Sequence, residues 1–309
     1  MSLSVATLAS SWRFAEAIAV MAARFGDQFD ETPRLARALV SHQRWMMTQA
    51  AFALYADHLA GRSSGPGLTA SGLADWICQT GIASRNTVLT YVDQLLSYRF
   101  IRLHPASAKR PRSFEASEAS IDAMQRWLGV NLTVLDHVDG GERLEHFRQR
   151  PELLFLVQPE FARLCLDDQQ WREPGERIGL FLWTESGALV MDRFISLTPN
   201  AILEDDFYDL GTIDIPAMAE RFVMSRTHLQ RALRKAEQHG CIRRDGSGRA
   251  SHIWLSADFY QEYRDWLARK SAILDAVFEK EMMVAGETQQ AQPQSEPVTV
   301  ARSASNRGC

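Results

Sequence analysis

Two stretches of the chain that lie 141 positions apart share one order of apolar, small and polar residues. The shared positions are Ile77 and Met218, Cys78 and Ala219, Ala83 and Met224, Ser84 and Ser225, Arg85 and Arg226, Val88 and Leu229, Ile101 and Ile242, and Arg102 and Arg243. Farther along, a shift of 139 pairs Ser117 with Ser256, Trp127 with Trp266, Leu128 with Leu267, Leu135 with Leu274, Asp136 with Asp275, and Val138 with Val277. A pattern that recurs at a fixed distance indicates an internal duplication of about 140 residues.

The second stretch, residues 218–244, has the pattern of two helices joined by a turn and followed by a strand. Ser225 is a favourable N-cap for the second helix, and Gly240 is a typical helix stop. Between them, apolar residues recur at three- and four-residue spacing on one helix face: Leu229, Ala232, Leu233 and Ala236. The residues around the turn at 245–248 alternate as in a two-stranded β wing.

The duplication predicts a mainly α protein with small β wings, organised as a tandem winged helix-turn-helix. Each copy would contain a leading helix, a long helix, a winged helix-turn-helix and a closing helix, and the two copies would form a pseudo-dimer within one chain. The expected boundaries are 1–140 for the first copy and 141–285 for the second. Residues 286–309 are rich in Gln, Ser and Pro, which predicts a disordered tail.

Charge is distributed unevenly along the chain. The formal net charge of -4 excludes a uniformly basic nucleic-acid coat, so any binding to phosphate needs local patches. Residues 221–249 contain eight Lys or Arg and two acidic residues, and residues 84–112 contain six and one. Both candidate patches coincide with a predicted helix-turn-helix.

Several classes of function lack their sequence signatures. The four cysteines, Cys78, Cys165, Cys241 and Cys309, have no spacing typical of a disulfide framework or a zinc site, and the eight histidines are scattered. No phosphate loop, nucleophile–base pair or carboxylate dyad stands out, so we expect no enzyme, no catalytic residue, no metal and no cofactor. No apolar run approaches the roughly 18 residues of a membrane span, which predicts a cytoplasmic, nucleoid-associated protein without a membrane partner.

The predicted second helix of each motif carries side chains suited to double-stranded DNA. Such a helix presents its N-terminal residues to base edges in the major groove, while flanking cations bind phosphate. The candidate contacts are Ser84, Arg85, Asn86, Thr87 and Thr90 in the first copy, and Ser225, Arg226, Thr227, His228, Gln230 and Arg231 in the second. On the wings they are Lys109, Arg110, Arg112 and Arg249.

On these residues each copy resembles the MarR family of bacterial transcriptional regulators, in which a long helix precedes a winged helix-turn-helix (here residues 73–103), a basic wing and closing helices. The resemblance covers residues 65–136 and 208–280. It implies a DNA-binding dimer that places two recognition helices on a palindrome, and a small aromatic effector, in many members an acid, between the dimerisation helices and the DNA-binding lobe. Because both copies lie in one chain here, their different helices would read different half-sites.

A ligand pocket has a weaker signal. His42, Trp45 and Met46 on the first long helix, Trp76 beside the first motif, and Trp183 in the second copy are candidates to line one. Aromatic and Met stripes at helical spacing are more often plain core.

These observations predict a sequence-specific DNA-binding transcriptional regulator, which occupies an operator or contacts RNA polymerase or another protein. Its two recognition helices would lie in successive major grooves. One open alternative is a plasmid or phage replication initiator with tandem winged helices, which would bind repeated origin sequences. Another is an adaptor whose winged helices hold protein partners, indicated by negligible DNA affinity at low salt.

Overall fold

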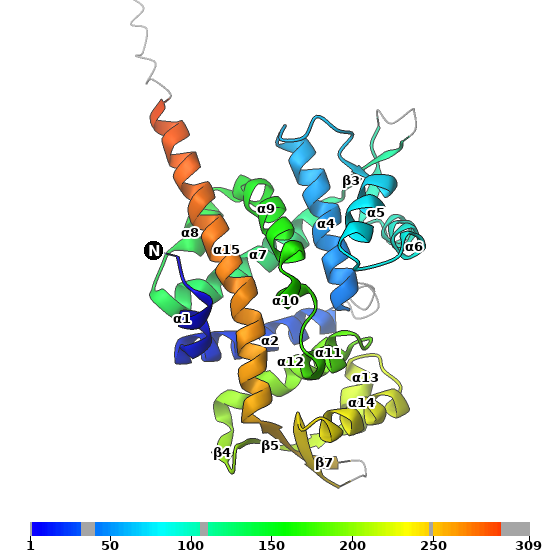
Figure 1. Ribbon diagram of the computed structural model, residues 1–309, viewed down its shortest axis with the longest axis vertical. Coiled ribbons are helices and arrows are strands. Elements are labelled where there is room, and N and C mark those ends of the chain that lie inside the picture. The colour runs from blue at the N-terminus through cyan, green and yellow to red at the C-terminus, as the bar shows by residue number, and fades with distance from the viewer. Residues whose placement is uncertain (1, 32–40, 106–110, 247–249, 292–309) are drawn as a thin grey trace, which may run out of the picture.

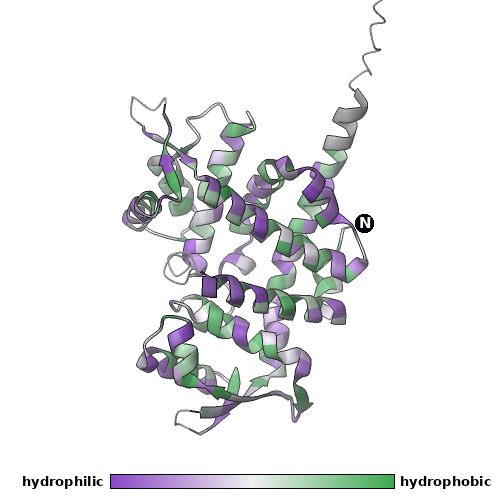
Figure 2. Ribbon diagram, turned by 180° about the vertical axis from the view of Figure 1, so that it is seen from behind, coloured by the Kyte–Doolittle hydropathy of each residue, from purple (hydrophilic) through white to green (hydrophobic). Residues whose placement is uncertain are grey.

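The computed structural model describes residues 2–31, 41–105, 111–246 and 250–291, with side chains as far as Val284 in the last helix (Figure 1). The described residues form mainly helices with two small antiparallel sheets, which confirms the predicted class. Figure 2 shows that individual helices combine hydrophobic and hydrophilic residues, as expected for helices with one face in a core.

The first half contains the helices expected before the first motif. In order its elements are α1 (Val5–Ser10), α2 (Trp12–Glu31), α4 (His42–Leu59), β1 (Leu68–Thr69), α5 (Ala70–Gln79), α6 (Arg85–Ser97), β2 (Ile101–Leu103), β3 (Ser113–Ala116) and α7 (Glu118–Asp139). The leading helix of the first copy is α2, which continues to Glu31. The long helix that follows is α4, which is capped by Ser41.

The second half has more and shorter helices before its sheet. They are α8 (Arg143–Gln149), η1 (Pro151–Leu153), α9 (Leu154–Asp167), α10 (Gln169–Arg172), α11 (Glu176–Leu182), α12 (Gly187–Leu197) and η2 (Thr198–Asn200). The remaining elements are β4 (Ile202–Glu204), β5 (Phe207–Asp214), α13 (Ile215–Arg221), α14 (Arg226–Gln238), β6 (Ile242–Asp245), β7 (Ala250–Ser256) and α15 (Ala257–Ala291).

The last helix runs through residues 286–291, which composition had assigned to the tail. Extending an existing helix fixes one residue for each hydrogen bond gained, so residues of good helix propensity such as Glu287 and Ala291 continue it readily. The rest of the predicted tail lies outside the described residues.

The two sheets have the same core topology. We name residues 68–116 the first unit and residues 202–256 the second unit. The strand order is β1-β3-β2 in the first unit and β4-β5-β7-β6 in the second, so β5-β7-β6 repeats the first order and β4 is an additional edge strand. α6 and α14 each have 13 residues and begin 141 positions apart.

Equivalent hydrogen bonds recur in the two units. Ser84 Oγ accepts from Thr87 N–H at 3.3 Å, and Ser225 Oγ accepts from His228 N–H at 3.1 Å, so both predicted N-caps are confirmed. Where the helices end, the matching backbone bonds are Phe100 N–H to Leu95 O (2.9 Å), Cys241 N–H to Ala236 O (2.8 Å), Ser117 N–H to Phe100 O (2.9 Å) and Ser256 N–H to Cys241 O (2.9 Å).

The sequence did not predict β1, β4 or β5, the strands that precede each helix pair. In β5 the alternation of residues is broken by Gly211, whose φ of 73° lies in the region that favours glycine. The pairing of β5 with β7 shifts register between Asp209 and Thr212, around this glycine. A pattern with such a break does not satisfy the two-residue period of a strand.

Helices of one half pack against helices of the other in a reciprocal way. α4 of the first half lies against α9 of the second, and α12 of the second lies against α2 of the first. Similarly, α1 packs on α15, and α8 packs on α7. Each half therefore completes the core of the other.

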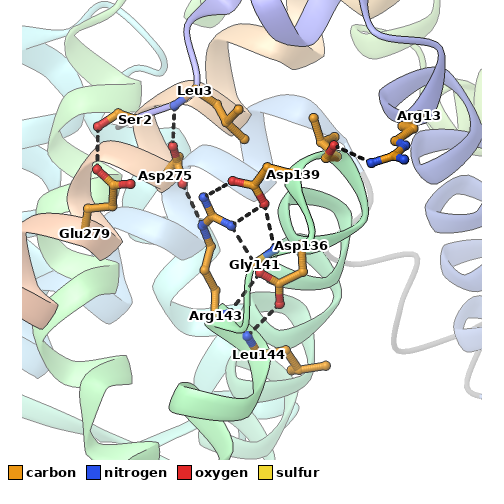
Figure 3. A network of polar contacts seen from close by, with 11 residues as sticks. Ser2, Leu3, Arg13, Asp136, Asp139, Gly141, Arg143, Leu144, Asp275 and Glu279 are labelled. Carbon is orange, nitrogen blue, oxygen red and sulfur yellow. Dashed lines mark hydrogen bonds and ion pairs between the residues drawn. The ribbon is translucent and has the colours of Figure 1, made fainter.

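Two aspartates at corresponding positions anchor these contacts (Figure 3). Asp136 on α7 accepts from Leu144 N–H at 2.9 Å, and Asp275 on α15 accepts from Leu3 N–H at 2.6 Å. Arg143 joins the two sites, because its Nε donates to Asp275 at 2.7 Å and its Nη1 lies 3.2 Å from Asp136. The same guanidinium bonds Asp139 and thereby lowers the pKa of that carboxyl.

Removing either aspartate is expected to destabilise the protein strongly. Asp136→Ala and Asp275→Ala each leave a backbone amide and part of the largely buried Arg143 guanidinium unpaired. Because a buried ion pair that loses one partner leaves an uncompensated charge, each variant should lose about 3–5 kcal/mol of unfolding free energy. Denaturant titration measures this loss. Glu145→Ala, which removes an exposed carboxylate 3.9 Å from Arg148, should cost less than about 1 kcal/mol; equal losses in all three variants would contradict the anchoring role.

A buried lysine gives a second prediction. Lys270 on α15 donates to Asn131 Oδ1 on α7 at 2.8 Å, and burial lowers the pKa of Lys270 from 10.5 to about 8. The folded protein thus binds this proton more weakly than the unfolded chain. The resulting stability is complete above pH 10.5 and is lost as pH falls through 8.

Between pH 7 and 10.5, wild type should therefore gain about 3 kcal/mol of unfolding free energy relative to Lys270→Met. Denaturant unfolding of both proteins at several pH values measures the difference. Subtracting the variant removes the contribution of titrating groups that do not interact with Lys270. A difference that stays constant with pH would show that Lys270 carries no buried charge.

Candidate nucleic-acid interface

The two predicted recognition helices, α6 and α14, lie toward the same side of the molecule, with α6 in its upper half and α14 in its lower part (Figures 1 and 2). They are not parallel. α6 runs close to the line of sight in both views, whereas α14 runs across it in Figure 1. Each unit is connected to the helical core through the closing helix that follows it, α7 or α15.

α14 presents a cationic surface. Leu229, Leu233 and Ala236 are fully buried and hold the helix on its unit. The exposed residues of the helix are Arg226, Thr227, His228, Arg231, Arg234 and Lys235. The helix therefore carries four exposed cations. Arg234 and Lys235 were not among the predicted contacts, although their positions opposite the apolar face already indicated exposure.

The other cations of the second patch are used within the protein. Arg221 donates to Asp30 of α2 at 3.0 Å, and the guanidinium of Arg243 lies 3.8 Å from the ring centroid of Phe207. Arg244 donates to Glu237 at 2.7 Å and to the amide oxygen of Gln230 at 2.7 Å. Because Asp30 lies outside the window 221–249, its pair with Arg221 lowers the charge that the sequence count assigned to this patch. The bond from Arg244 occupies the side-chain oxygen of Gln230, a predicted DNA contact.

The first unit is closer to neutral. Arg85 at the start of α6 pairs with Asp75 of α5 at 2.7 Å, and Arg102 of β2 pairs with Glu115 of β3 at 2.8 Å. Both carboxylates lie outside the 84–112 window in which the sequence count was made. The helix pair and the strand pair bring them back beside the cations, which lowers the local positive potential.

The remaining predicted contacts fall into three groups. Ser84 and Ser225 are N-caps whose hydroxyl oxygens already accept backbone N–H groups. Asn86, Thr87 and Thr90 are exposed but border a hollow of about 360 Å³ between α6 and the beginning of α4. Arg112 is exposed beside β3, while Lys109, Arg110 and Arg249 lie outside the described residues.

A separate apolar cavity of about 200 Å³ lies between the helical core and the first unit. Among the residues predicted to line a pocket, Trp45 lines this cavity. Trp127, which was not predicted, lines it as well. The others lie elsewhere. Met46 is fully buried in the core, and His42 packs edge-on against Trp171 and Trp183. Burial lowers the pKa of His42 to about 4, so this ring is a neutral packing element.

Within the described residues, no group of three or more His, Cys, Asp or Glu side chains is arranged to hold a metal ion. Across the same residues, no helix is both long and apolar enough to cross a membrane. The cationic surface of α14 and the apolar cavity beside α4 are two features of the described residues with distinct chemistry.

Comparison with protein-family models, with curated proteins and with solved structures finds no match to this chain.

Proposed function

We propose that the chain is a double-stranded DNA-binding transcriptional regulator, and that α14 supplies most of its affinity. The observation that carries this proposal is the row of exposed cations on α14, a capped helix that projects from a small sheet. Lys and Arg on such a surface bind phosphates and release counterions, which favours binding to a polyanion even though the whole chain is acidic.

We further propose that the two units are winged helix-turn-helix domains that arose by duplication and form a pseudo-dimer in one chain. The repeated strand order, the repeated hydrogen bonds and the reciprocal helix packing support this. The matching contacts of Asp136 and Asp275 also support it, because Leu144 and Leu3 differ by the same 141 positions as the two motifs.

The two units differ in surface chemistry, which favours an asymmetric DNA site. α14 is strongly cationic, whereas the charge of α6 is offset by Asp75 and its exposed side chains are mostly uncharged. The helices also differ in direction (Figure 1). We therefore propose that the second unit provides phosphate affinity, and that the first unit adds base contacts through Asn86 and Thr90.

An adaptor function for the first unit is the second candidate. Apart from its reduced charge, this unit exposes Leu89 and Tyr98 at the two ends of α6 and Leu103 on β2. Exposed apolar residues near an uncharged helix surface suit a protein partner better than a phosphate backbone. A replication initiator, by contrast, would select repeated copies of one sequence.

A selection from randomised duplex DNA, followed by affinity measurements over a range of salt, tests the proposal. Wild type should enrich one bipartite, non-palindromic sequence. Arg231→Ala combined with Arg234→Ala should weaken binding at least tenfold and reduce the slope of log K against log salt by about 2, because two phosphate contacts are lost. Arg148→Ala, an exposed cation on α8, is the matched control and should bind as wild type. Unchanged affinity of the double variant would exclude α14 as the DNA-binding surface.

The ion pair of the first unit gives a separate prediction. Asp75→Asn frees Arg85 from its partner at 2.7 Å, so DNA affinity should rise several-fold. Arg85→Ala alone should have little effect but should abolish the gain in the Asp75→Asn background. Asp93→Asn removes the same charge from α6 and controls for a general electrostatic effect. If Asp75→Asn changes affinity no more than Asp93→Asn does, Arg85 does not reach DNA, and the adaptor function is favoured.

A further inference from the structure

The sheet of the second unit has an open edge at β4. This strand is the outermost of the four, and Figure 1 shows it at the margin of the molecule. Successive side chains of a strand point to opposite faces of its sheet. Ile202 is 66% exposed and Leu203 is 53% exposed, so the described residues close off neither face of β4. An exposed strand edge is a template for a further strand.

The first unit shows how such an edge can be closed. Its edge strand on this side is β1, which pairs with β3 as β5 pairs with β7. Leu68 and Thr69 of β1 are both buried, and α4 packs against the strand. In the second unit, β4 is added outside β5 and its side chains are exposed. Among the described residues, one unit therefore covers this edge with a helix and the other presents it to solvent.

The hairpin of β4 and β5 determines which backbone groups face outward. Glu204 pairs with Phe207. The two residues between them, Asp205 and Asp206, have φ of 46° and 63°, as in the tight turns typical of hairpins. The residues that flank such a turn form a hydrogen-bonded pair, and hydrogen-bonded pairs alternate with non-hydrogen-bonded pairs along the strands. The N–H and C=O of Glu204 therefore face β5, whereas those of Leu203 face away from it.

Charge at this edge selects the kind of strand that can be added. Three consecutive carboxylates, Glu204, Asp205 and Asp206, end β4 and form its turn, and all three side chains are exposed. Within the described residues, no cation pairs with them. Arg243 borders the same hollow, but its guanidinium lies 3.8 Å from the ring centroid of Phe207. Because opposite charges on neighbouring strands stabilise their pairing and like charges oppose it, the edge favours a basic strand.

A second copy of the chain fits this edge poorly. If two β4 strands paired around a twofold axis at Leu203, two acidic turns would flank one short interface. Glu204 of each copy would then lie opposite an aliphatic residue, Ile202, instead of a cation. A strand of three residues offers few hydrogen bonds to offset this repulsion.

We propose that β4 binds an extended, basic segment of a partner protein as a fifth strand of the second sheet. In such binding, main-chain hydrogen bonds give affinity and alternate side chains give specificity. The partner residue opposite Leu203 would continue the row formed by Leu203, Tyr208 and Leu255, so an apolar side chain fits there. The residues on either side of it would lie on the outer face, where Lys or Arg meets Glu204. This site is independent of the proposed DNA-binding function.

A short peptide in which Lys alternates with Val is a suitable probe. One control has Glu in place of every Lys, and the other has Pro in place of the central Val, which removes a backbone donor without changing the charge. Anisotropy of the labelled peptides measures binding to the full chain. The Lys/Val peptide should bind at least tenfold more tightly than either control. No binding of this peptide, or equal binding of the Pro version, would overturn the proposal.

Variants at Leu203 test the backbone contact. Leu203→Pro removes the outward N–H and should weaken binding of the Lys/Val peptide at least tenfold. Proline is tolerated on an edge strand where the N–H faces solvent, so the hairpin should be retained. Leu203→Ala keeps the N–H and should weaken binding less. Full affinity in Leu203→Pro would place the peptide elsewhere.

Hydrogen exchange of the wild-type chain tests the same contact without a substitution. Saturating Lys/Val peptide should slow exchange of the Leu203 amide at least tenfold. The amide of Glu204, which already faces β5, should change less. Unchanged exchange at Leu203 with bound peptide would exclude strand addition at β4, even if Leu203→Pro does not fold.

Neutralising the acidic hairpin tests the charge requirement. The triple variant is Glu204→Gln, Asp205→Asn and Asp206→Asn, in which Asn suits the positive φ of the turn. It should weaken binding of the Lys/Val peptide at least tenfold and reduce the effect of salt. The matched control removes the same charge from exposed carboxylates on α7 and η1, through Glu118→Gln, Asp122→Asn and Glu152→Gln. Equal losses in the two triple variants would show that the peptide follows the general charge of the chain, which would overturn the proposal.

Sedimentation and DNA binding separate the alternatives. Concentration-dependent dimerisation that Leu203→Pro abolishes, without peptide binding, would assign the edge to a second copy and overturn the proposal. Peptide binding in the absence of DNA binding would support the β4 site while the DNA-binding function fails. DNA binding without peptide binding would have the opposite meaning.

Discussion

The fold depends on the carboxylates of Asp136 and Asp275. Each accepts a backbone N–H group from the beginning of the opposite half, from Leu144 and Leu3 respectively. A buried carboxylate is tolerated only when its oxygens are hydrogen-bonded. Asp275, whose side chain is fully buried, meets this condition only when the N-terminus of the chain returns to α15 and presents Leu3 N–H. Arg143 then bonds Asp275 and Asp136 together (Figure 3). The closure of the fold is thus set by a polar requirement, with apolar packing of α1 on α15 around it.

Once α7 and α15 are fixed in this way, the two units take their places at the ends of the molecule, because each unit continues directly into one of these helices. The core between them is a spacer shared by both halves. However, the first unit also rests on the continuous α4, whereas the second is supported by the shorter α11 and α12. Different supports explain why equivalent units present α6 and α14 in different directions.

Local signals in the sequence were sufficient to predict α6 and α14 but not their surroundings. Ser84 and Ser225 cap helices that begin at the next residue, as predicted, because capping depends on three or four neighbouring residues. The partners that neutralise the cations were missed, since Asp75 lies ten positions before Arg85, and Asp30 lies 191 positions before Arg221. The sequence indicated Trp45 as a candidate pocket residue on the first long helix. It did not predict the cavity beside Trp45, because a cavity depends on small residues in other elements.

Two units with the same core strand order can differ in their surfaces when they belong to one chain. In a homodimer every substitution appears twice, so a cation placed on one recognition helix or a cavity opened in one half is repeated in the other. Here α14 exposes four cations, whereas Arg85, the exposed cation of α6, is paired with Asp75. The unit with the weaker cationic surface also exposes the apolar side chains of Leu89, Tyr98 and Leu103, so the two units present different chemistry to a partner.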